Sequence, residues 1–110
     1  MSEFAEFHAH VYFDESNIDA ARNLCEAASS KFGITMGRMH EKPVGPHPRW
    51  SCQLLILGEQ FGEVIPWLSV NRGDLTVFIH GQSEDVLADH TQHAMWMGEL
   101  LELNLSSFGK

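Results

Sequence analysis

The stretch FHAHVYF, residues 7–13, alternates apolar residues with two histidines and a tyrosine. Because successive side chains of a β-strand point to opposite faces of its sheet, the four odd-numbered residues form one apolar face. His8, His10 and Tyr12 then share the opposite face, which is neither apolar nor simply hydrated. The stretch therefore predicts a strand over residues 6–13 that packs one face into a core and presents imidazoles on the other.

Two amphipathic helices and three more strands are predicted from the apolar pattern beyond this strand. Apolar residues recur at steps of three and four over residues 18–32, and Gly33 suits the left-handed position that ends a helix. A second helix is expected within residues 59–71, where Pro66 should cause a kink or a late start. The three further strands are short apolar runs at residues 34–39, 50–57 and 75–80.

The predicted order of strand, helix, strand, strand, helix, strand is that of the ferredoxin-like α+β fold, βαββαβ. In this antiparallel sheet the first strand lies between the third and the fourth, two helices cover one face, and the other face is open. A C-terminal extension is expected to follow, in which Ser83 caps a helical turn and residues 101–105 form a short fifth strand. The whole chain, residues 1–110, is expected to be one domain.

Composition and charge exclude several classes of function. Fifteen acidic against seven basic residues give a net charge of −8, which argues against binding to nucleic acids or anionic membranes. No apolar run approaches the ~20 residues that span a bilayer. The N-terminal MSEFAEF lacks the features of a secretory signal, so a cytoplasmic location is expected. Cys25 and Cys52 follow no metal-binding spacing, which indicates two buried free thiols.

Three histidines are predicted to converge on the open face of the sheet. Alternation along residues 75–80 puts His80 on the face opposite the apolar residues of that strand. Because the first and fourth strands run antiparallel, the start of one lies beside the end of the other, which brings His8 and His10 near His80. Imidazoles in such positions can share one metal ion at nitrogen–metal distances of about 2.1 Å. The alternative is that they are ordinary surface or interface residues.

The loop of residues 40–49, which holds three prolines, offers a second group of candidates. Within it, the prolines beside His47 fix the backbone, and the planar guanidinium of Arg49 suits a carboxylate. This loop is expected at the end of the first strand remote from His8. From there it could act on the same substrate across the sheet face or serve a partner's site. A rigid surface turn is the alternative.

The segment DHTQHAMWMGE, residues 89–99, is the third candidate. His90 and His93 share a helix face at a spacing of three residues, and Gly98 allows a turn just before the carboxylate of Glu99. The Met-Trp-Met run between them is more typical of core packing than of contact with a cofactor.

Taken together, FHAHVYFD, GPHPRWSCQ, the strand ending in His80 and DHTQHAMWMGE resemble the DOPA 4,5-dioxygenase family over about residues 7–105. The resemblance implies a ferredoxin-like fold and extradiol cleavage of a catechol ring, that of DOPA or a related compound, with O2 and non-haem Fe(II). Zinc or another divalent metal in the isolated protein is an alternative. A homodimer is expected, because so short a domain exposes a sheet face. One departure is that His80 is followed by GQSED rather than by the family's proline and Asn/Thr/Gly turn, which leaves the substrate open.

Roles for individual residues follow from this resemblance and from the predicted placement. The metal ligands are expected to be His8, His10, His80 and Glu99. The catalytic residues are expected to be His47 and His90, and the substrate-binding residues Arg49, Tyr12 and Trp50. Two other readings remain open: a non-enzymatic homodimeric module that binds a metal or a small aromatic ligand, and a dimeric interaction protein whose histidines lie in the interface.

Overall fold

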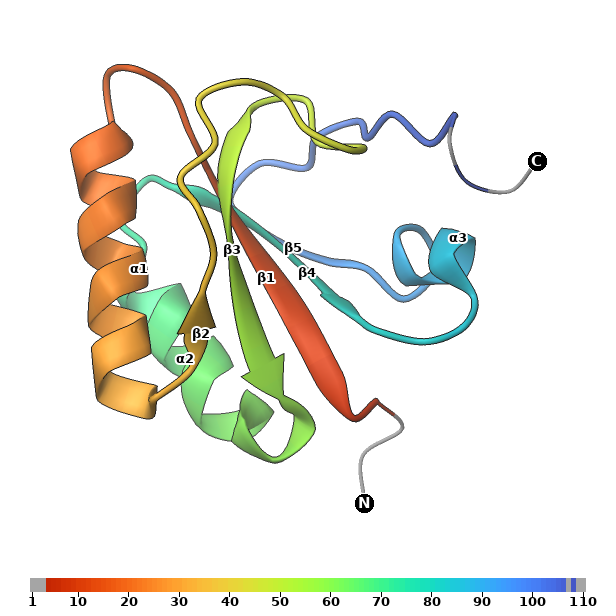
Figure 1. Ribbon diagram of the computed structural model, residues 1–110, viewed down its shortest axis with the longest axis horizontal. Coiled ribbons are helices and arrows are strands. Elements are labelled where there is room, and N and C mark those ends of the chain that lie inside the picture. The colour runs from red at the N-terminus through yellow and green to blue at the C-terminus, as the bar shows by residue number, and fades with distance from the viewer. Residues whose placement is uncertain (1–3, 107, 109–110) are drawn as a thin grey trace.

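A five-stranded antiparallel sheet organises residues 4–106 and 108, the part of the chain that the computed structural model describes (Figure 1). The order of the strands is β2-β3-β1-β4-β5, so the first strand lies between the third and the fourth, as predicted. The strands are β1 (Glu6–Phe13), β2 (Thr35–Met36), β3 (Trp50–Leu57), β4 (Thr76–Gly81) and β5 (Met95–Met97).

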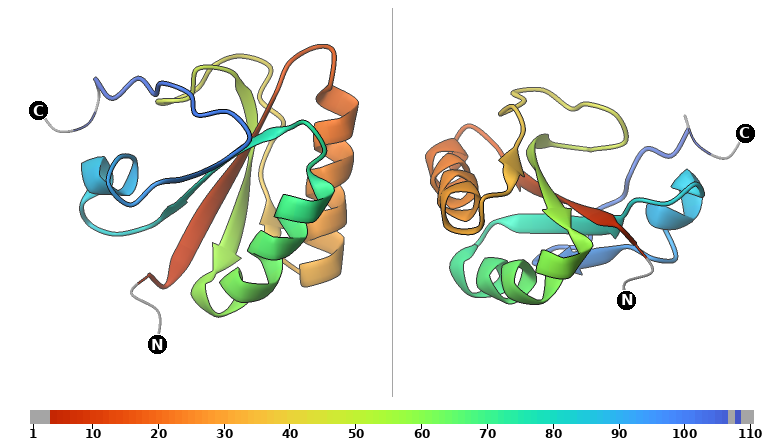
Figure 2. Two further views of the ribbon diagram at one scale, coloured as in Figure 1. Left: turned by 180° about the vertical axis from the view of Figure 1, so that it is seen from behind. Right: turned by 60° about the horizontal axis from the view of Figure 1, so that its bottom comes forward.

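Two long helices cover one face of this sheet, as the βαββαβ pattern predicts. The helices are α1 (Ile18–Phe32) and α2 (Phe61–Asn71), with a 3-10 turn, η1 (Gly58–Gln60), directly before α2 and a short helix, α3 (Val86–Asp89), after β4. Figures 1 and 2 show α1 and α2 side by side on one side of the sheet, and α3 and the C-terminal segment on the other. No helix in the described residues is long and apolar enough to cross a membrane.

The core lies between the sheet and these two helices. The odd-numbered residues of β1 are buried there, and Ala9 pairs with both Leu54 of β3 and Ile79 of β4. Ala21, Leu24, Cys25 and Ala28 line the buried stripe of α1, which ends at Gly33 with a φ of 69°, the left-handed conformation that glycine adopts most easily. The alternation of β1 therefore places His8, His10 and Tyr12 on the face away from α1 and α2.

Three sequence-based expectations about element bounds were wrong. The fifth strand is not at residues 101–105; instead β5 pairs with β4, where Trp96 lies opposite Phe78 and stacks on it at 4.5 Å. Asp85, not Ser83, caps the short helix, because its side chain accepts a hydrogen bond from the amide of Ala88. The second strand has only two residues, although the chain stays beside β3, because Gly37 and His40 make only separate backbone hydrogen bonds to Gln53 and Ser51.

The second face of the sheet is covered rather than open. Residues 40–49, α3 and the segment after β5 lie over it, and Figure 1 shows the proline-rich loop meeting the C-terminal segment. The amide of Asn104 donates a hydrogen bond to the carbonyl of Pro46 at 2.8 Å, which joins these two segments. As a result Tyr12, Phe78 and His80 are almost fully buried although they point away from the helices.

Candidate metal centre

The side chains of β1 and β4 that point away from α1 and α2 form three successive rows on the covered face. Antiparallel pairing sets these rows, and each row lies about 6.6 Å from the next, because two residues of a strand span that distance. The cross-strand pairs are His8 with His80, His10 with Phe78, and Tyr12 with Thr76.

His8, His10 and His80, called here the histidine triad, come together as predicted. One ring nitrogen from each lies within 4.8 Å of those of the other two, and Nε2 of His10 lies 3.0 Å from Nε2 of His80. Two nitrogens that bind one ion at ~2.1 Å and at a right angle are about 3.0 Å apart, so this pair fits a metal ion. Without an ion, the same distance suits an N–H···N hydrogen bond between the two rings.

A main-chain contact sets the orientation of His80. Its Nδ1 lies 3.0 Å from the carbonyl oxygen of Gly81, which can only accept a hydrogen bond. Nδ1 therefore carries the proton, and Nε2 directs its lone pair at His10. This is the arrangement typical of metal-binding histidines, in which the second ring nitrogen donates to a fixed acceptor.

Burial keeps the triad neutral at ordinary pH. The pKa of His10 lies well below its usual value because the ring is buried and four other imidazoles lie near it. Burial also lowers the pKa of His80 to about 4 and, less strongly, lowers that of His8, which Glu6 partly offsets. Metal ions bind neutral imidazole, so these shifted values prepare the three rings for a divalent cation.

His47 reaches the middle of the same face rather than its far end. Its ring centroid lies 4.1 Å from that of His10, and its Nδ1 lies 2.7 Å from the hydroxyl of Tyr12. Burial raises the pKa of Tyr12 and lowers that of His47 to about 4, so both groups are neutral. The tyrosine hydroxyl can donate to Nδ1, and in that arrangement His47 carries its proton on Nε2.

His90 lies beside the triad, and His93 does not. The His90 ring is 4.2 Å from that of His80, and its Nδ1 lies 2.8 Å from the carbonyl oxygen of Val86. Nδ1 therefore donates, which leaves Nε2 of the neutral ring as the position that can accept a proton. His93 instead makes an edge contact with Phe4 at 6.2 Å.

A buried carboxylate anchors the loop that presents His90. Asp89 is only 1% exposed and accepts two hydrogen bonds from Ser83, one from its amide at 2.8 Å and one from its hydroxyl at 2.7 Å. These bonds close the loop between β4 and α3 and fix the position of the neighbouring histidine.

We expect Asp89→Ala to destabilise the fold by about 2 kcal/mol, because both Ser83 donors lose a buried charged acceptor. Urea unfolding monitored by tryptophan fluorescence measures this change. Asp85→Ala, which removes only the helix cap, is the matched variant and should cost about 1 kcal/mol. Equal or smaller loss for Asp89→Ala would show that its hydrogen bonds contribute little.

The structure places three other predicted site residues away from the triad. Arg49 and Glu99 form an ion pair, with Nη1 and Oε1 2.8 Å apart, and Glu99 does not belong to the histidine group. Trp50 lies opposite Phe13 and packs against the core on the helix side. Trp50 therefore lies outside this face, and the ion pair lies at the end of the face where Glu99 contacts Thr76.

Trp96 is a residue of this face that the sequence analysis assigned to core packing. It stacks on Phe78 at 4.5 Å and on Tyr12 at 6.1 Å, beside the row that holds His10. Its position could have been predicted if residues 95–97 had been assigned to a strand. Alternation along a strand then places Trp96 on one face of the sheet and Met95 and Met97 on the other.

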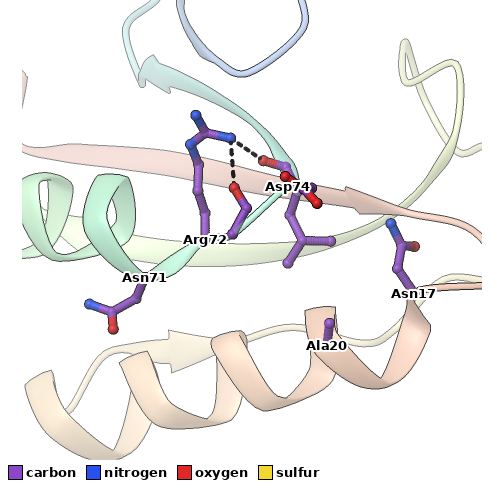
Figure 3. Close-up of a pocket in the computed structure, with 7 residues that line it drawn as sticks. Asn17, Ala20, Asn71, Arg72 and Asp74 are labelled. Carbon is purple, nitrogen blue, oxygen red and sulfur yellow. Dashed lines mark hydrogen bonds between the residues drawn. The ribbon is translucent and has the colours of Figure 1, made fainter.

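A separate cavity of about 270 Å³ lies on the helix side of the sheet, away from the histidines (Figure 3). It is bordered by Asn17 and Ala20 at the start of α1 and by the turn from α2 to β4. Nη1 of Arg72 donates to the carbonyl oxygens of Gly73 and Leu75. Arg72 thus holds the turn that leads into β4.

The low pKa values predict an acid-sensitive fold when no metal is bound. His47 and His80 titrate near 4 in the folded chain and near 6.5 when unfolded, so between these values the unfolded chain binds more protons. The free energy of unfolding should therefore be fully retained above pH 6.5 and fall as the pH drops toward 4, by up to roughly 3 kcal/mol for each histidine.

Urea unfolding in the presence of a chelator, at several pH values between 7.5 and 4.5, measures this dependence. Replacing His47 by Gln should flatten the curve, whereas His93→Gln is the control and should leave it unchanged. A stability that is constant over this range would contradict the neutral, buried state of the two rings.

The fold and the site together define a class: a small ferredoxin-like α+β protein with a histidine centre on the sheet face remote from its helices. The chain belongs to the Dopa 4,5-dioxygenase family, whose model matches residues 7–107. The resemblance drawn from the sequence is thereby confirmed.

Similar proteins agree with this membership. An uncharacterized 21.2 kDa protein from Botryotinia fuckeliana is 40% identical over 91% of this chain, and a DOPA 4,5-dioxygenase from Amanita muscaria is 31% identical over 96% of it. The matched regions cover 61% and 50% of those two proteins, so this chain spans only part of their length. The crystal structure of a candidate dioxygenase from Nostoc punctiforme PCC 73102 superposes with a TM-score of 0.90 at 41% identity, over 94% of this chain and 90% of the other.

Proposed function

We propose that this protein is a ring-cleaving dioxygenase of the extradiol type, which acts on DOPA or a related catechol with O2 and non-haem Fe(II). The observation that carries the proposal is the histidine triad, with the two facing Nε2 atoms of His10 and His80 at the spacing of a shared metal ion. Membership of the Dopa 4,5-dioxygenase family and the similarity to a DOPA 4,5-dioxygenase support the substrate class.

His8, His10 and His80 would hold the metal, and Glu99 has no part in this proposed ligand set. Three neutral imidazoles suit Fe(II), and also zinc, because nitrogen donors bind both ions well. When bound, the metal supplies open coordination positions for the catechol and a path for electrons between the ring and O2. His8 is less deeply buried than His10 and His80, so it would form the outer side of this ligand set.

The two remaining histidines of the face are suited to opposite proton-transfer roles. His90 has a free lone pair on Nε2, because its Nδ1 donates to Val86, and it can accept a proton from a catechol hydroxyl. In the arrangement in which Nδ1 of His47 accepts from Tyr12, His47 carries a proton on Nε2 and can donate it to an oxygen that gains negative charge. We therefore assign the base to His90 and the acid to His47.

The aromatic side chains beside the triad would position the ring of the substrate. Trp96, Phe78 and Tyr12 form a stacked group next to His10 and exclude water from this part of the face. Aromatic rings favour stacked or edge contacts with a planar ligand.

The direct test is anaerobic loading with Fe(II), followed by oxygen uptake and a visible spectrum after addition of L-DOPA. We expect oxygen consumption in proportion to a yellow ring-opened product, and the apo protein as control should give neither. Metal binding without oxygen uptake for any catechol would overturn the enzymatic proposal and favour a non-enzymatic binding module. The homodimer expected from the sequence remains a prediction, which sedimentation velocity would check.

A further inference from the structure

A charged pair lies at one end of the face that carries the triad. Nη1 of Arg49 and Oε1 of Glu99 are 2.8 Å apart, and the side chains are 43% and 61% exposed. Arg49 precedes β3 and Glu99 follows β5, so the pair joins segments far apart in the sequence. By contrast, among the described residues the ion pair of His8 with Glu6 lies within β1, and that of Arg22 with Asp19 lies within α1.

Backbone geometry aims Glu99 at this position. Gly98 has a φ of 87°, a left-handed conformation that turns the chain directly before Glu99. The amide of Glu99 then donates to Oγ1 of Thr76 at 3.3 Å, and Oγ1 lies 3.5 Å from the carboxylate. Thr76 belongs to the same row as Tyr12, so the carboxylate is held over that row.

The pair is close enough to serve a ligand that binds at the triad. The row of Tyr12 and Thr76 lies about 6.6 Å from the row of His10, because two strand residues separate them. The positive charge of Arg49 acts on the hydroxyl of Tyr12, which in turn contacts His47 beside the triad. A ligand whose ring lies beside the row of His10 would thus extend its head group along the face toward the row of Tyr12 and Thr76.

The charges of the pair are available for exchange with a ligand. A partly exposed ion pair contributes little to stability, so its opening costs little. A guanidinium binds a carboxylate through two parallel hydrogen bonds, and a carboxylate accepts hydrogen bonds from an ammonium group. Two opposite charges side by side therefore complement a group that itself carries both charges.

We propose that Arg49 and Glu99 recognise a zwitterionic amino-acid head group, with Arg49 on its carboxylate and Glu99 on its ammonium. This inference rests on the proposed function, because it takes the catechol to be bound at the triad. Glu99 is then a specificity-determining residue. The pair selects catechols that carry an amino-acid head group over catechols that lack one. A ligand with only a carboxylate meets the negative charge of Glu99, and a ligand with only an amine meets the positive charge of Arg49, so each is disfavoured.

Four catechols separate these contributions: L-DOPA, dopamine, 3,4-dihydroxyhydrocinnamic acid and 4-methylcatechol. Their affinities for the Fe(II)-loaded protein are measured by calorimetry without oxygen, and their turnover is measured separately with oxygen. We expect the native protein to bind L-DOPA at least about tenfold more tightly than each of the others, the effect of one charged hydrogen bond.

The two variants should shift these preferences in opposite directions. Glu99→Gln should weaken L-DOPA and dopamine about tenfold and leave or improve the binding of the amine-free acid. Arg49→Gln should weaken the binding of L-DOPA and of the amine-free acid, and it should leave the binding of dopamine unchanged or improve it. Glu63, which is exposed, and Arg22, which is partly buried and paired with Asp19, lie on the two helices far from this face. They provide the matched controls, Glu63→Gln and Arg22→Gln, which should change none of the four affinities.

Equal affinities of the native protein for all four catechols, or equal losses for all four in both variants, would overturn the zwitterion proposal. If oxygen uptake still occurs in that case, the proposed dioxygenase function stands without it. Conversely, the expected pattern of affinities without oxygen uptake for any catechol would support recognition of the head group and overturn the proposed function.

Discussion

Replacement of His10 by alanine is expected to abolish tight metal binding and, with it, oxygen uptake. His10 is the central ligand of the triad, since its Nε2 lies 3.0 Å from that of His80 and its ring also contacts those of His8 and His47. Loss of a mere orienting partner of a metal ligand lowers affinity 10- to 100-fold. Loss of the ligand itself should therefore lower the affinity for Fe(II) or Zn(II) by at least about 100-fold.

Metal content after dialysis and calorimetric titration measure this change. His10→Gln serves as a second variant, because it keeps most of the buried volume and separates loss of the ligand from loss of packing. His93→Ala is the matched control, since His93 lies against Phe4 outside the triad. Native affinity in both His10 variants, with a folded circular-dichroism spectrum, would contradict the assignment of the metal centre.

Replacement of His47 by alanine should give the second-largest effect, a loss of about 10²- to 10⁴-fold in kcat with the metal retained. The reason is that His47 offers the proton on Nε2 to the reacting oxygen but is not one of the three grouped ligands. Steady-state oxygen uptake, with metal content measured on the same samples, separates the two effects.

Tyr12→Phe is the matched variant for this experiment. It removes only the hydroxyl that donates to Nδ1 of His47, so it frees the imidazole to change its tautomer but leaves the ring in place. A smaller decrease in kcat than for His47→Ala is expected, together with unchanged metal content. Loss of metal from His47→Ala, or a kcat equal to that of the native protein, would assign His47 a different role.

The strands that build the metal centre could be predicted from the sequence, because period-two alternation is a local signal. Alternation along β1 and β4 assigns His8, His10 and His80 to one face, and the βαββαβ order places these strands side by side. The same alternation along β3 puts Trp50 on the helix side with Cys52, so its position could also have been predicted from the pattern.

The covering loops could not be predicted in the same way. The prolines beside His47 restrict the backbone but do not determine which way the loop folds. That direction depends on two long-range contacts, the hydrogen bond from Tyr12 to His47 and the one from Asn104 to Pro46. The position of Glu99 likewise depends on where β5 ends, and the pairing of residues 95–97 with β4 was not foreseen.

Main-chain carbonyls, rather than side chains, orient two of the histidines on the covered face. His80 donates to the carbonyl of Gly81, and His90 donates to that of Val86. Every amino acid supplies a carbonyl, so a substitution of Val86 leaves the acceptor of His90 in place. Position 81 is restricted to glycine for a different reason, because a Cβ there would collide with the ring of Phe4. The tautomer of His90 thus tolerates change in its neighbour's side chain, whereas the backbone that orients His80 is held by packing against the N-terminal segment.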